Sequence, residues 1–321
     1  MSQPAAPAPP WRVSVFGLGY VGSVVAACLA RLGHHVLATD LNPDKVDLLN
    51  AGRSPIVEPG MEQLVAEERR AGRLGATRDP KEAVAGSDVS LIAVGSPSRA
   101  NGDVDLGALE RVSRDVGEAL AAKAGFHTVA IRSTVLPGTI ESVIIPAMER
   151  ASSKGGGAGF AVCSNPEFMR EGSAVADFFS PPFTVLGARD RAHLAPLVAL
   201  YAALPGPVFE TSLRTAEMVK YVSNAFHAVK VAFANEIGTL CRESGVDAGE
   251  VMKVFRADTK LNVSAAYLRP GFAFGGSCLP KDLRALTYRA RQSHLNLPLL
   301  ESILISNQAH IERAIERILA T

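Results

Sequence analysis

The sequence predicts an α/β protein, in which a doubly wound parallel sheet is followed by an α-helical domain with a long central helix. Two observations lead to this fold class. Strand-like apolar runs alternate with helix-period segments up to about residue 210, as parallel strands joined by crossover helices require. From about residue 211 the pattern is helical only, which predicts a second domain of a different class.

The first domain is predicted from six strand-like runs. They cover residues 12–17, 35–40, 88–95, 127–134, 160–167 and 183–188, and helix-period segments lie at 21–33 and 105–125. Each run is nearly continuous in apolar residues, as in a sheet covered by helices on both faces. We expect this domain to span residues 12–210, after a Pro/Ala-rich tail at 1–11 that we expect to be disordered.

The second domain, residues 211–321, is predicted to be helical throughout. One long periodic segment at 215–245 would be its central helix, and 246–258 and 297–321 would be further helices.

The composition excludes several classes of protein. Of 321 residues, 47% are hydrophobic and 20% charged, which is typical of globular proteins, and the net charge of +1 indicates neither a nucleic-acid nor a membrane surface. Four cysteines show neither CxxC nor metal-ligand spacing, so we expect no metal site, no disulfide framework and a reducing, cytoplasmic location. The N-terminus lacks the features of a signal peptide, and no apolar run is long enough to cross a bilayer.

A dinucleotide-binding motif follows the first strand run. Gly17, Gly19 and Gly22 form GxGxxG, whose glycines permit a tight turn, close approach of a pyrophosphate and helix–strand packing. Asp40 ends the second strand run, where its carboxylate would accept hydrogen bonds from ribose hydroxyls and repel a 2′-phosphate. Together they predict a Rossmann-type domain that binds NAD rather than NADP. The alternatives are a glycine turn that binds nothing and an Asp40 that only caps the next helix.

Small hydroxyl side chains follow the third and fourth strand runs. Ser96, Ser133 and Thr134 lie at the carboxyl ends of strands, where ligands bind in such sheets. These residue types are also ordinary in turns, so a cofactor contact and a plain turn explain them equally well.

A polar stripe lies on the otherwise apolar segment at 215–245. Lys220, Asn224 and His227 fall at i, i+4 and i+7 and therefore share one helix face. A buried lysine requires an anionic partner, such as a ligand or a developing oxyanion. The alternative is a solvated face with an amphipathic lysine, although the poor helix propensity of a mid-helix asparagine favours a functional stripe.

A carboxylate-bearing loop follows the fifth strand run. Residues 163–174 contain Glu167 and Glu171, and the Asn-Pro pair breaks the strand so that Glu167 projects from a loop at the strand end. Glu167 is interpreted either as a general base or as an N-terminal helix charge.

A single thiol stands in an unusual setting at residues 272–282. Cys278 follows two glycines and precedes Lys281 and Asp282, and a nearby lysine favours a thiolate. For Cys278 alone, a thiol packed in a loop would be the ordinary explanation. Combined with NAD, the thiol predicts oxidation of an aldehyde through a covalent thiohemiacetal and a thioester.

Six motifs, in order, resemble those of the UDP-glucose/GDP-mannose dehydrogenase family. They are FGLGYVG, SPIVEPG, RSTVLPGT, NPEF, NEIG and FGGSCLPKD, spread over residues 12–310. SPIVEPG and the stretches at 94–107 and 260–290 are most similar to members that act on GDP-mannose. The resemblance implies NAD-dependent, four-electron oxidation of a sugar-nucleotide C6 alcohol to the uronate, GDP-mannose to GDP-mannuronate. The family also carries a further C-terminal α/β domain, which we expect this chain to lack.

The resemblance implies roles for individual residues. Cys278 would be the thioester nucleophile, and Lys220 and Asn224 would stabilise the alkoxide or oxyanion. Asp282 would position water and Lys220, and Glu167 would act as acid and base in thioester hydrolysis. NAD contacts would come from Tyr20, Val21, Asp40, Lys45, Ser96, Thr134 and Lys281, beside the glycines of the fingerprint. Sugar-nucleotide contacts would come from Glu171, Lys220, Asn224, His227, Asn235, Tyr267, Arg269, Phe272 and Gly275, some across a homodimer, or a higher homo-oligomer, formed through the central helices.

Three alternatives stay open at this point. UDP-glucose is the nearest alternative substrate. A two-domain β-hydroxyacid dehydrogenase pairs a similar fold with a Lys-x-x-x-Asn helix and would not need Cys278. Outside the enzymes, the alternative is a catalytically weak, NAD-binding dimeric remnant.

Overall fold

The computed structural model describes residues 10–154, 159–243, 245–259, 271–292, 294 and 298–320. The chain divides into two compact units. The first unit comprises Met1–Ser96 with Asp105–Lys220, and the second comprises Pro97–Val104 with Tyr221–Thr321. Most of the predicted N-terminal tail lies outside the described residues. Trp11, which the prediction placed in the tail, packs against the core of the first unit.

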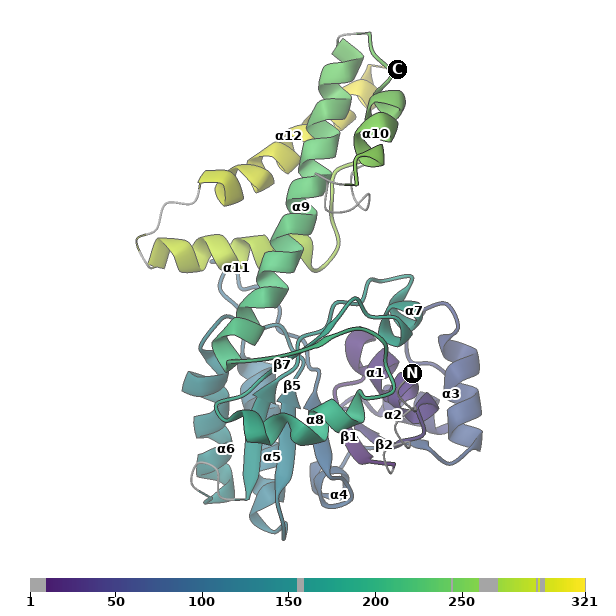
Figure 1. Ribbon diagram of the computed structural model, residues 1–321, viewed down its shortest axis with the longest axis vertical. Helices are drawn as coiled ribbons and strands as arrows, with labels where there is room; N and C mark the ends of the chain where they lie inside the picture. Colours follow the sequence, from purple (N-terminus) through teal and green to yellow (C-terminus); the bar gives the residue numbers. More distant parts are fainter. Residues whose placement is uncertain are drawn as a thin grey trace, which may run out of the picture. The chain divides into compact units, whose positions relative to one another are not determined.

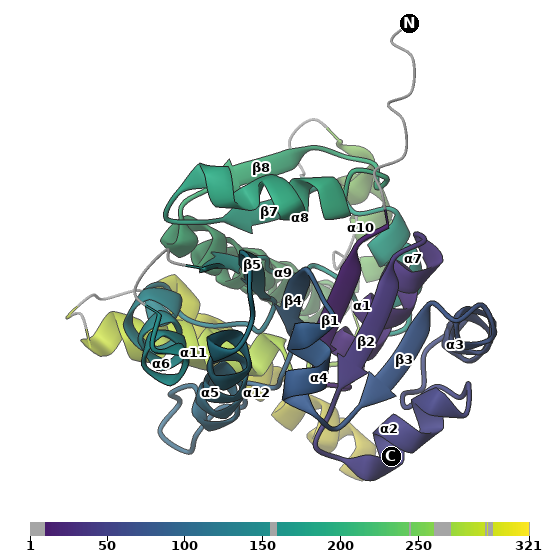
Figure 2. The ribbon, with the colours of Figure 1, turned by 90° about the horizontal axis from the view of Figure 1, so that it is seen from below.

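One sheet, of eight strands among the described residues, forms the centre of the first unit (Figure 2). The strands are β1 (Arg12–Phe16), β2 (His35–Thr39), β3 (Leu74–Thr77), β4 (Val89–Ile92), β5 (His127–Ile131), β6 (Phe160–Ser164), β7 (Thr184–Gly187) and β8 (Val208–Thr211). Their order is β3-β2-β1-β4-β5-β6-β7-β8, and neighbours are parallel except for β6 and β7, which meet antiparallel at Ser164 and Gly187. The predicted doubly wound parallel sheet is confirmed apart from this pair.

Two strands escaped the sequence prediction for a simple reason. β3 is four residues long and contains a glycine, and the residues of β8 are mostly exposed, so neither shows an apolar run. The antiparallel β7 has a different cause. The segment before it stays at the carboxyl edge of the sheet, where Gly172 is hydrogen-bonded to Tyr20, so the chain re-enters the sheet from that edge.

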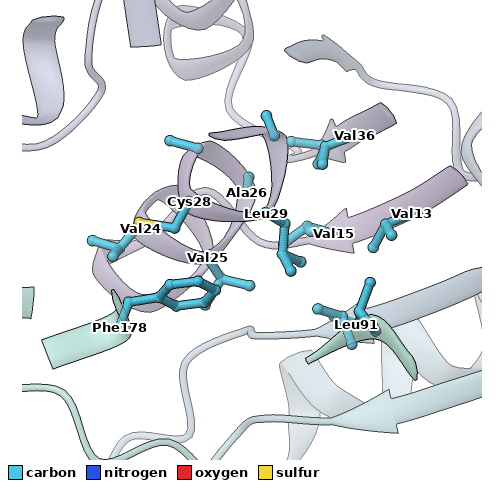
Figure 3. Close-up of a cluster of buried hydrophobic side chains, with 14 of the residues drawn as sticks. Val13, Val15, Val24, Val25, Ala26, Cys28, Leu29, Val36, Leu91 and Phe178 are labelled. Carbon is cyan, nitrogen blue, oxygen red and sulfur yellow. The ribbon is translucent and has the colours of Figure 1, made fainter. Parts of the chain in front are cut away.

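Helices cover both faces of the sheet. They are α1 (Tyr20–Arg31), α2 (Pro43–Asn50), α3 (Met61–Arg70), α4 (Pro80–Ala85), α5 (Gly107–Ala121), α6 (Ile145–Ser152) after a π-helical turn at Ile140–Ile144, α7 (Ala174–Phe179), and α8 (Ala195–Leu200) after a 3-10 turn at Arg191–Leu194. On one face, side chains of α1, α2, α3, α7 and α8 pack on the strands, and on the other those of α4, α5 and α6 do. In Figure 3, Val25 and Leu29 of α1 lie over Val15 and Leu91 of the sheet, and Phe178 of α7 points toward Val25.

The chain order reverses between β1 and β4. β2 and β3 extend the sheet on one side of β1, and β4 and β5 extend it on the other. In sheets of this kind ligands bind beyond the carboxyl ends of the strands at such a reversal. The glycine-rich turn after β1 lies there, because a Cβ on Gly17 would come within 2.9 Å of the backbone oxygen of Ala93, just after β4.

The second unit is helical (Figure 1). Its helices are α9 (Leu213–Glu243), which begins in the first unit, α10 (Ala248–Ala257), α11 (Leu279–Gln292) and α12 (Pro298–Leu319). Three alanines of α9 pack with Leu283 of α11 and Ile303 of α12, since small side chains let the helices approach closely. The long central helix and the two other predicted helices are confirmed. The sequence prediction did not include α11.

The start of α9 belongs to the first unit. Leu213 is part of the core beneath β4 and β5, and Glu217 and Lys220 are bonded to loops of the first unit. In the part of the chain that the structure describes, no helix is both long and apolar enough to span a membrane.

Candidate active site

The three fingerprint glycines serve two different purposes. Gly17 has φ +100° and donates its N–H to the Thr39 carbonyl at 2.7 Å, and a Cβ on Gly22 would lie 1.7 Å from the Gly17 oxygen. Both are therefore required by the turn itself. Gly19 has φ −73°, and a Cβ there would meet no atom within 4 Å. No packing contact explains Gly19, so its missing side chain leaves room for a ligand.

The first turn of α1 fits an anion. Gly19 is the N-cap, and no side chain caps the helix, whose N-terminal N–H groups carry partial positive charge. Tyr20 and Val21, the first residues of the helix, are half-buried. The predicted cofactor therefore has a place for its pyrophosphate in front of this helix.

Asp40 is held in place by backbone N–H groups. One carboxylate oxygen accepts from Leu18 N at 2.6 Å and the other from Asn42 N at 2.9 Å, and Lys45 Nζ is 4.0 Å away. The suggestion that Asp40 only caps the next helix is wrong, because the cap of α2 is Asn42, whose side chain accepts from Asp44 N. A hollow of about 130 Å³ adjoins Asp40 and Gly17 and is suited to the nucleoside part of a dinucleotide.

The predicted hydroxyls join the loops after β4 and β5. Ser96 Oγ donates to the Thr134 carbonyl at 2.7 Å, and Ser133 Oγ donates to the Val94 carbonyl at 2.7 Å. Both serines thus have a structural partner within the first unit. They fix the edge of the crevice whether or not they also contact a cofactor.

Lys220 and Glu167 form a buried ion pair. Lys220 Nζ lies 2.9 Å from Glu167 Oε1, and both side chains are less than a tenth exposed. The other Glu167 oxygen accepts from Met169 N at 2.8 Å, and Lys220 Nζ is 5.7 Å from the centre of the Phe168 ring. The predicted anionic partner of Lys220 is therefore Glu167, on the loop at residues 165–173 (the NPEF loop), and the solvated-face alternative is wrong for this lysine.

Arg132 holds the beginning of the NPEF loop, and sequence reasoning did not single it out. Its Nη1 donates to Asn165 Oδ1 at 2.6 Å and to the Tyr201 hydroxyl at 2.9 Å, and Tyr201 donates to the same Asn165 oxygen. Arg132, Asn165 and Glu167 line a cavity of about 40 Å³. One feature of the sequence could have pointed to Arg132, because it is a charged residue directly after the buried strand β5 and directly before Ser133 and Thr134.

Glu217 fastens α9 to the loop after β5. It is almost fully buried, and its carboxylate accepts from Gly138 N at 2.6 Å and from Ile140 N at 2.9 Å. Burial raises the pKa of the Glu217 carboxyl, and the two backbone donors act in the opposite direction. This residue, also missed from sequence, fixes the helix that carries Lys220.

In the second unit, Asp282 is a buried carboxylate between two predicted site residues. Asn224 Nδ2 donates to Asp282 Oδ2, and Lys281 Nζ lies 3.2 Å from Oδ1. Asp282 Oδ1 is buried and makes no hydrogen bond among the described residues besides this ion pair. These contacts tie α9 to the first turn of α11.

Cys278 stands directly before α11. Its carbonyl accepts from Asp282 N at 2.9 Å, so the thiol lies at the N-terminal end of the helix, where negative charge is favoured. Cys278 is exposed, whereas the other three cysteines are buried, and burial raises the pKa of Cys28 and Cys163 to about 12. The packed-loop explanation is wrong for Cys278, the thiol that solvent can reach.

The remaining substrate candidates differ in their contacts. Asn235 Nδ2 donates to the Phe272 carbonyl at 3.1 Å, and Asn235 Oδ1 accepts from Gly271 N at 2.9 Å, so this amide holds the backbone before Cys278. Glu171, Phe272 and Gly275 are exposed, and His227 is half-buried. Tyr267 and Arg269 lie outside the described residues. No group of three metal-ligating side chains occurs among the residues that the structure describes.

Comparison with known proteins identifies relatives over nearly the whole chain. Residues 11–205 match the NAD-binding domain, and residues 214–309 the central domain, of the UDP-glucose/GDP-mannose dehydrogenase family. The chain is 51% identical to the GDP-mannose 6-dehydrogenase of Pseudomonas aeruginosa, over 96% of its own length and 70% of that protein. It is 42% identical to a UDP-glucose 6-dehydrogenase of Haloferax volcanii, over 95% of the chain and 71% of the relative. The solved UDP-glucose dehydrogenase of Pyrobaculum islandicum superposes with a TM-score of 0.90 at 40% identity, covering 96% of this chain and 70% of that one.

Gly19→Ala is expected to weaken NAD binding about tenfold or more, because the added methyl group fills the space in front of α1. Its free energy of unfolding should stay within about 1 kcal/mol of wild type, since no protein atom is close enough to clash. Calorimetric titration with NAD and urea unfolding measure the two quantities.

Gly22→Ala is the matched control, because its Cβ would meet the Gly17 oxygen and should cost about 1–3 kcal/mol of unfolding free energy. A folded Gly19→Ala protein that binds NAD as tightly as wild type would contradict this assignment.

Lys220→Met is expected to lower the free energy of unfolding by about 3 kcal/mol, because it leaves the Glu167 carboxylate buried without its cation. Adding Glu167→Gln should recover most of that loss, since the double variant buries no charge at this position. Urea unfolding of both single variants and the double variant measures the coupling. Losses that simply add would show that the pair is not energetically linked.

Proposed function

The chain belongs to the UDP-glucose/GDP-mannose dehydrogenase family, and on this premise we propose that it oxidises GDP-mannose to GDP-mannuronate with NAD as hydride acceptor. The observation that carries the substrate choice is the 51% identity to a GDP-mannose 6-dehydrogenase, against 42% and 40% for the UDP-glucose relatives compared. The crevice after β1 and β4 supports NAD as the cofactor, because Gly19 and the first turn of α1 would face its pyrophosphate and Asp40 its ribose.

The reaction removes four electrons from the C6 alcohol. One sugar nucleotide, two NAD⁺ and one water give one carboxylate, two NADH and three protons. Lys220 and Asn224 are one helical turn apart on α9 and would stabilise negative charge on the C6 oxygen. The Glu167 carboxylate, paired with Lys220, would accept the alcohol proton.

Cys278 would hold the aldehyde during the second half of the reaction. Its thiolate adds to the carbonyl carbon to give a thiohemiacetal, whose oxidation gives a thioester. Water then attacks the thioester carbon, the C–S bond breaks and the thiolate returns. Asp282 would help to position that water, and Glu167 would accept its proton.

We propose in addition that a second copy of this chain covers an exposed stripe of α9. Val222, Phe226 and Phe233 recur at helical spacing on one side of the helix and are 57%, 43% and 40% exposed. Large apolar side chains in such a row on one helix are typical of an interface between copies.

The function predicts that two NADH appear for each GDP-mannose consumed, because alcohol and aldehyde are both oxidised before release. Absorbance of NADH against chromatographic measurement of the sugar nucleotide gives the ratio. One NADH per sugar would break the mechanism, and faster NADH formation with UDP-glucose than with GDP-mannose would overturn the substrate. NAD binding without turnover of any sugar nucleotide would favour the inactive remnant.

Cys278→Ser is part of the same test and should lower GDP-mannuronate formation about a hundredfold or more, since no thioester forms. Cys241→Ala, which removes a buried thiol of the second unit, is the control and should keep the activity. Full turnover to the acid by Cys278→Ser would favour a β-hydroxyacid dehydrogenase type of chemistry.

Phe226→Glu is expected to shift the protein toward monomers, because it places a charge in the centre of the α9 stripe. Sedimentation equilibrium measures the mass. Val254→Glu, at an exposed apolar residue of α10, should leave the assembly unchanged. A wild-type protein that sediments as a monomer would rule out the interface.

A further inference from the structure

Glu58, in the SPIVEPG motif, is a buried carboxylate that takes no part in the proposed reaction. It lies between α2 and α3 and is 8% exposed. Both of its oxygens accept hydrogen bonds from residues distant in sequence. Oε2 accepts from the Tyr20 hydroxyl and from Gly172 N at 2.8 Å, and Oε1 accepts from Ala174 N at 2.7 Å.

These bonds connect the two ligand-binding loops of the first unit. Tyr20 is the first residue of α1, directly after the glycine turn that faces the cofactor. Gly172 lies at the end of the NPEF loop, which carries Glu167 and Glu171, and Ala174 is the first residue of α7 directly after it. Gly172 N also lies 3.0 Å from the Tyr20 hydroxyl, so the phenol contacts both the carboxylate and the loop. Phe178 of α7 packs in the same core as α1 and keeps the two elements together (Figure 3).

The ionisation states of the two side chains suit this connection. Burial by itself would raise the pKa of Glu58, but hydrogen bonds from Tyr20, Gly172 and Ala174 outweigh it and lower that pKa below its ordinary value. Burial and the bond to Glu58 raise the pKa of Tyr20 to about 12. At neutral pH the carboxylate is therefore charged, and the phenol keeps the proton that it donates.

We propose that Glu58 is a positioning residue that couples the cofactor turn to the NPEF loop. A pyrophosphate bound at the N-terminus of α1 fixes the backbone of Tyr20. The Tyr20 side chain then holds the Glu58 carboxylate, and the carboxylate in turn holds the N–H groups of Gly172 and Ala174. The loop then holds Glu167 and Glu171 in place for the sugar nucleotide. By linkage, an ordered loop strengthens NAD binding by the same factor. The coupling depends on the proposed function in one respect only, namely that the ligand held by the NPEF loop is a sugar nucleotide.

The test follows the amides of the NPEF loop with NADH as the only ligand. Hydrogen exchange of residues 168–176 is measured by mass spectrometry in wild type, Glu58→Gln, Tyr20→Phe and Glu62→Gln. In wild type NADH should slow exchange at this segment about fivefold or more. In Glu58→Gln, whose amide group places a donor against Gly172 N or Ala174 N, the effect of NADH should disappear.

Glu62→Gln is the matched control. Glu62 lies in the first turn of α3 and accepts from Ser54 N at 2.9 Å, a contact that does not reach the NPEF loop. It should behave as wild type. Tyr20→Phe removes one hydroxyl and leaves the bonds from Glu58 to Gly172 and Ala174, so it should keep the loop docked but lose the response to NADH. This variant decides the matter if Glu58→Gln does not fold.

A Tyr20→Phe or folded Glu58→Gln protein whose loop responds to NADH as wild type does would overturn the proposal. So would a wild-type loop whose exchange NADH does not change. A calorimetric titration of GDP-mannose with and without NADH extends the test, since the coupling should strengthen binding about fivefold in wild type and not in Glu58→Gln. If GDP-mannose does not bind wild type, the proposed substrate fails, while hydrogen exchange still decides the coupling.

Discussion

The Lys220–Glu167 ion pair is the constraint on which the first unit's chemistry depends. Two charges 2.9 Å apart in a buried position are tolerated only while they face each other, because either alone would lose its hydration without compensation. The pair therefore fixes the start of α9 against the NPEF loop. Glu217 accepts hydrogen bonds from the loop after β5 and so fixes the same helix at a second point, three residues before Lys220. In the proposed reaction, a cation held in this way would be pre-organised to stabilise charge on a substrate oxygen.

Buried polar side chains hold the loops at the carboxyl edge of the sheet. Loops lack the regular hydrogen bonds of helices and strands, so their backbone groups need other partners. Arg132 donates to Asn165, the first residue of the NPEF loop, and Glu58 accepts from Gly172 N near the other end of the loop. Asp40 does the same for the turn after β1. The loops around the crevice are therefore held by carboxylate and guanidinium groups, while the hydrophobic clusters on the two faces of the sheet hold the strands and helices.

Local sequence patterns predicted most of the fold because its elements are strongly periodic. Six strands and the long helix were found from apolar runs, while β3, β8 and α11 carry weak or misleading local signals. For the site, the sequence pointed to Lys220 and to a missing anion, but the partner is Glu167, 53 residues earlier in the chain. Such long-range pairing leaves no trace in a local pattern. Arg132 and Glu58 were missed for the same reason.

By itself the sequence determined the doubly wound sheet, the helical second unit, the cofactor fingerprint and the kinds of reactive group present, because these depend on residue spacing along the chain. Only the tertiary structure decided which charges meet. It separated Gly17 and Gly22, required by the turn, from Gly19, which no protein atom approaches. It also distinguished the exposed Cys278 from three buried thiols. The physical reason is that burial and ion pairing arise between segments far apart in the chain, and folding alone brings them together.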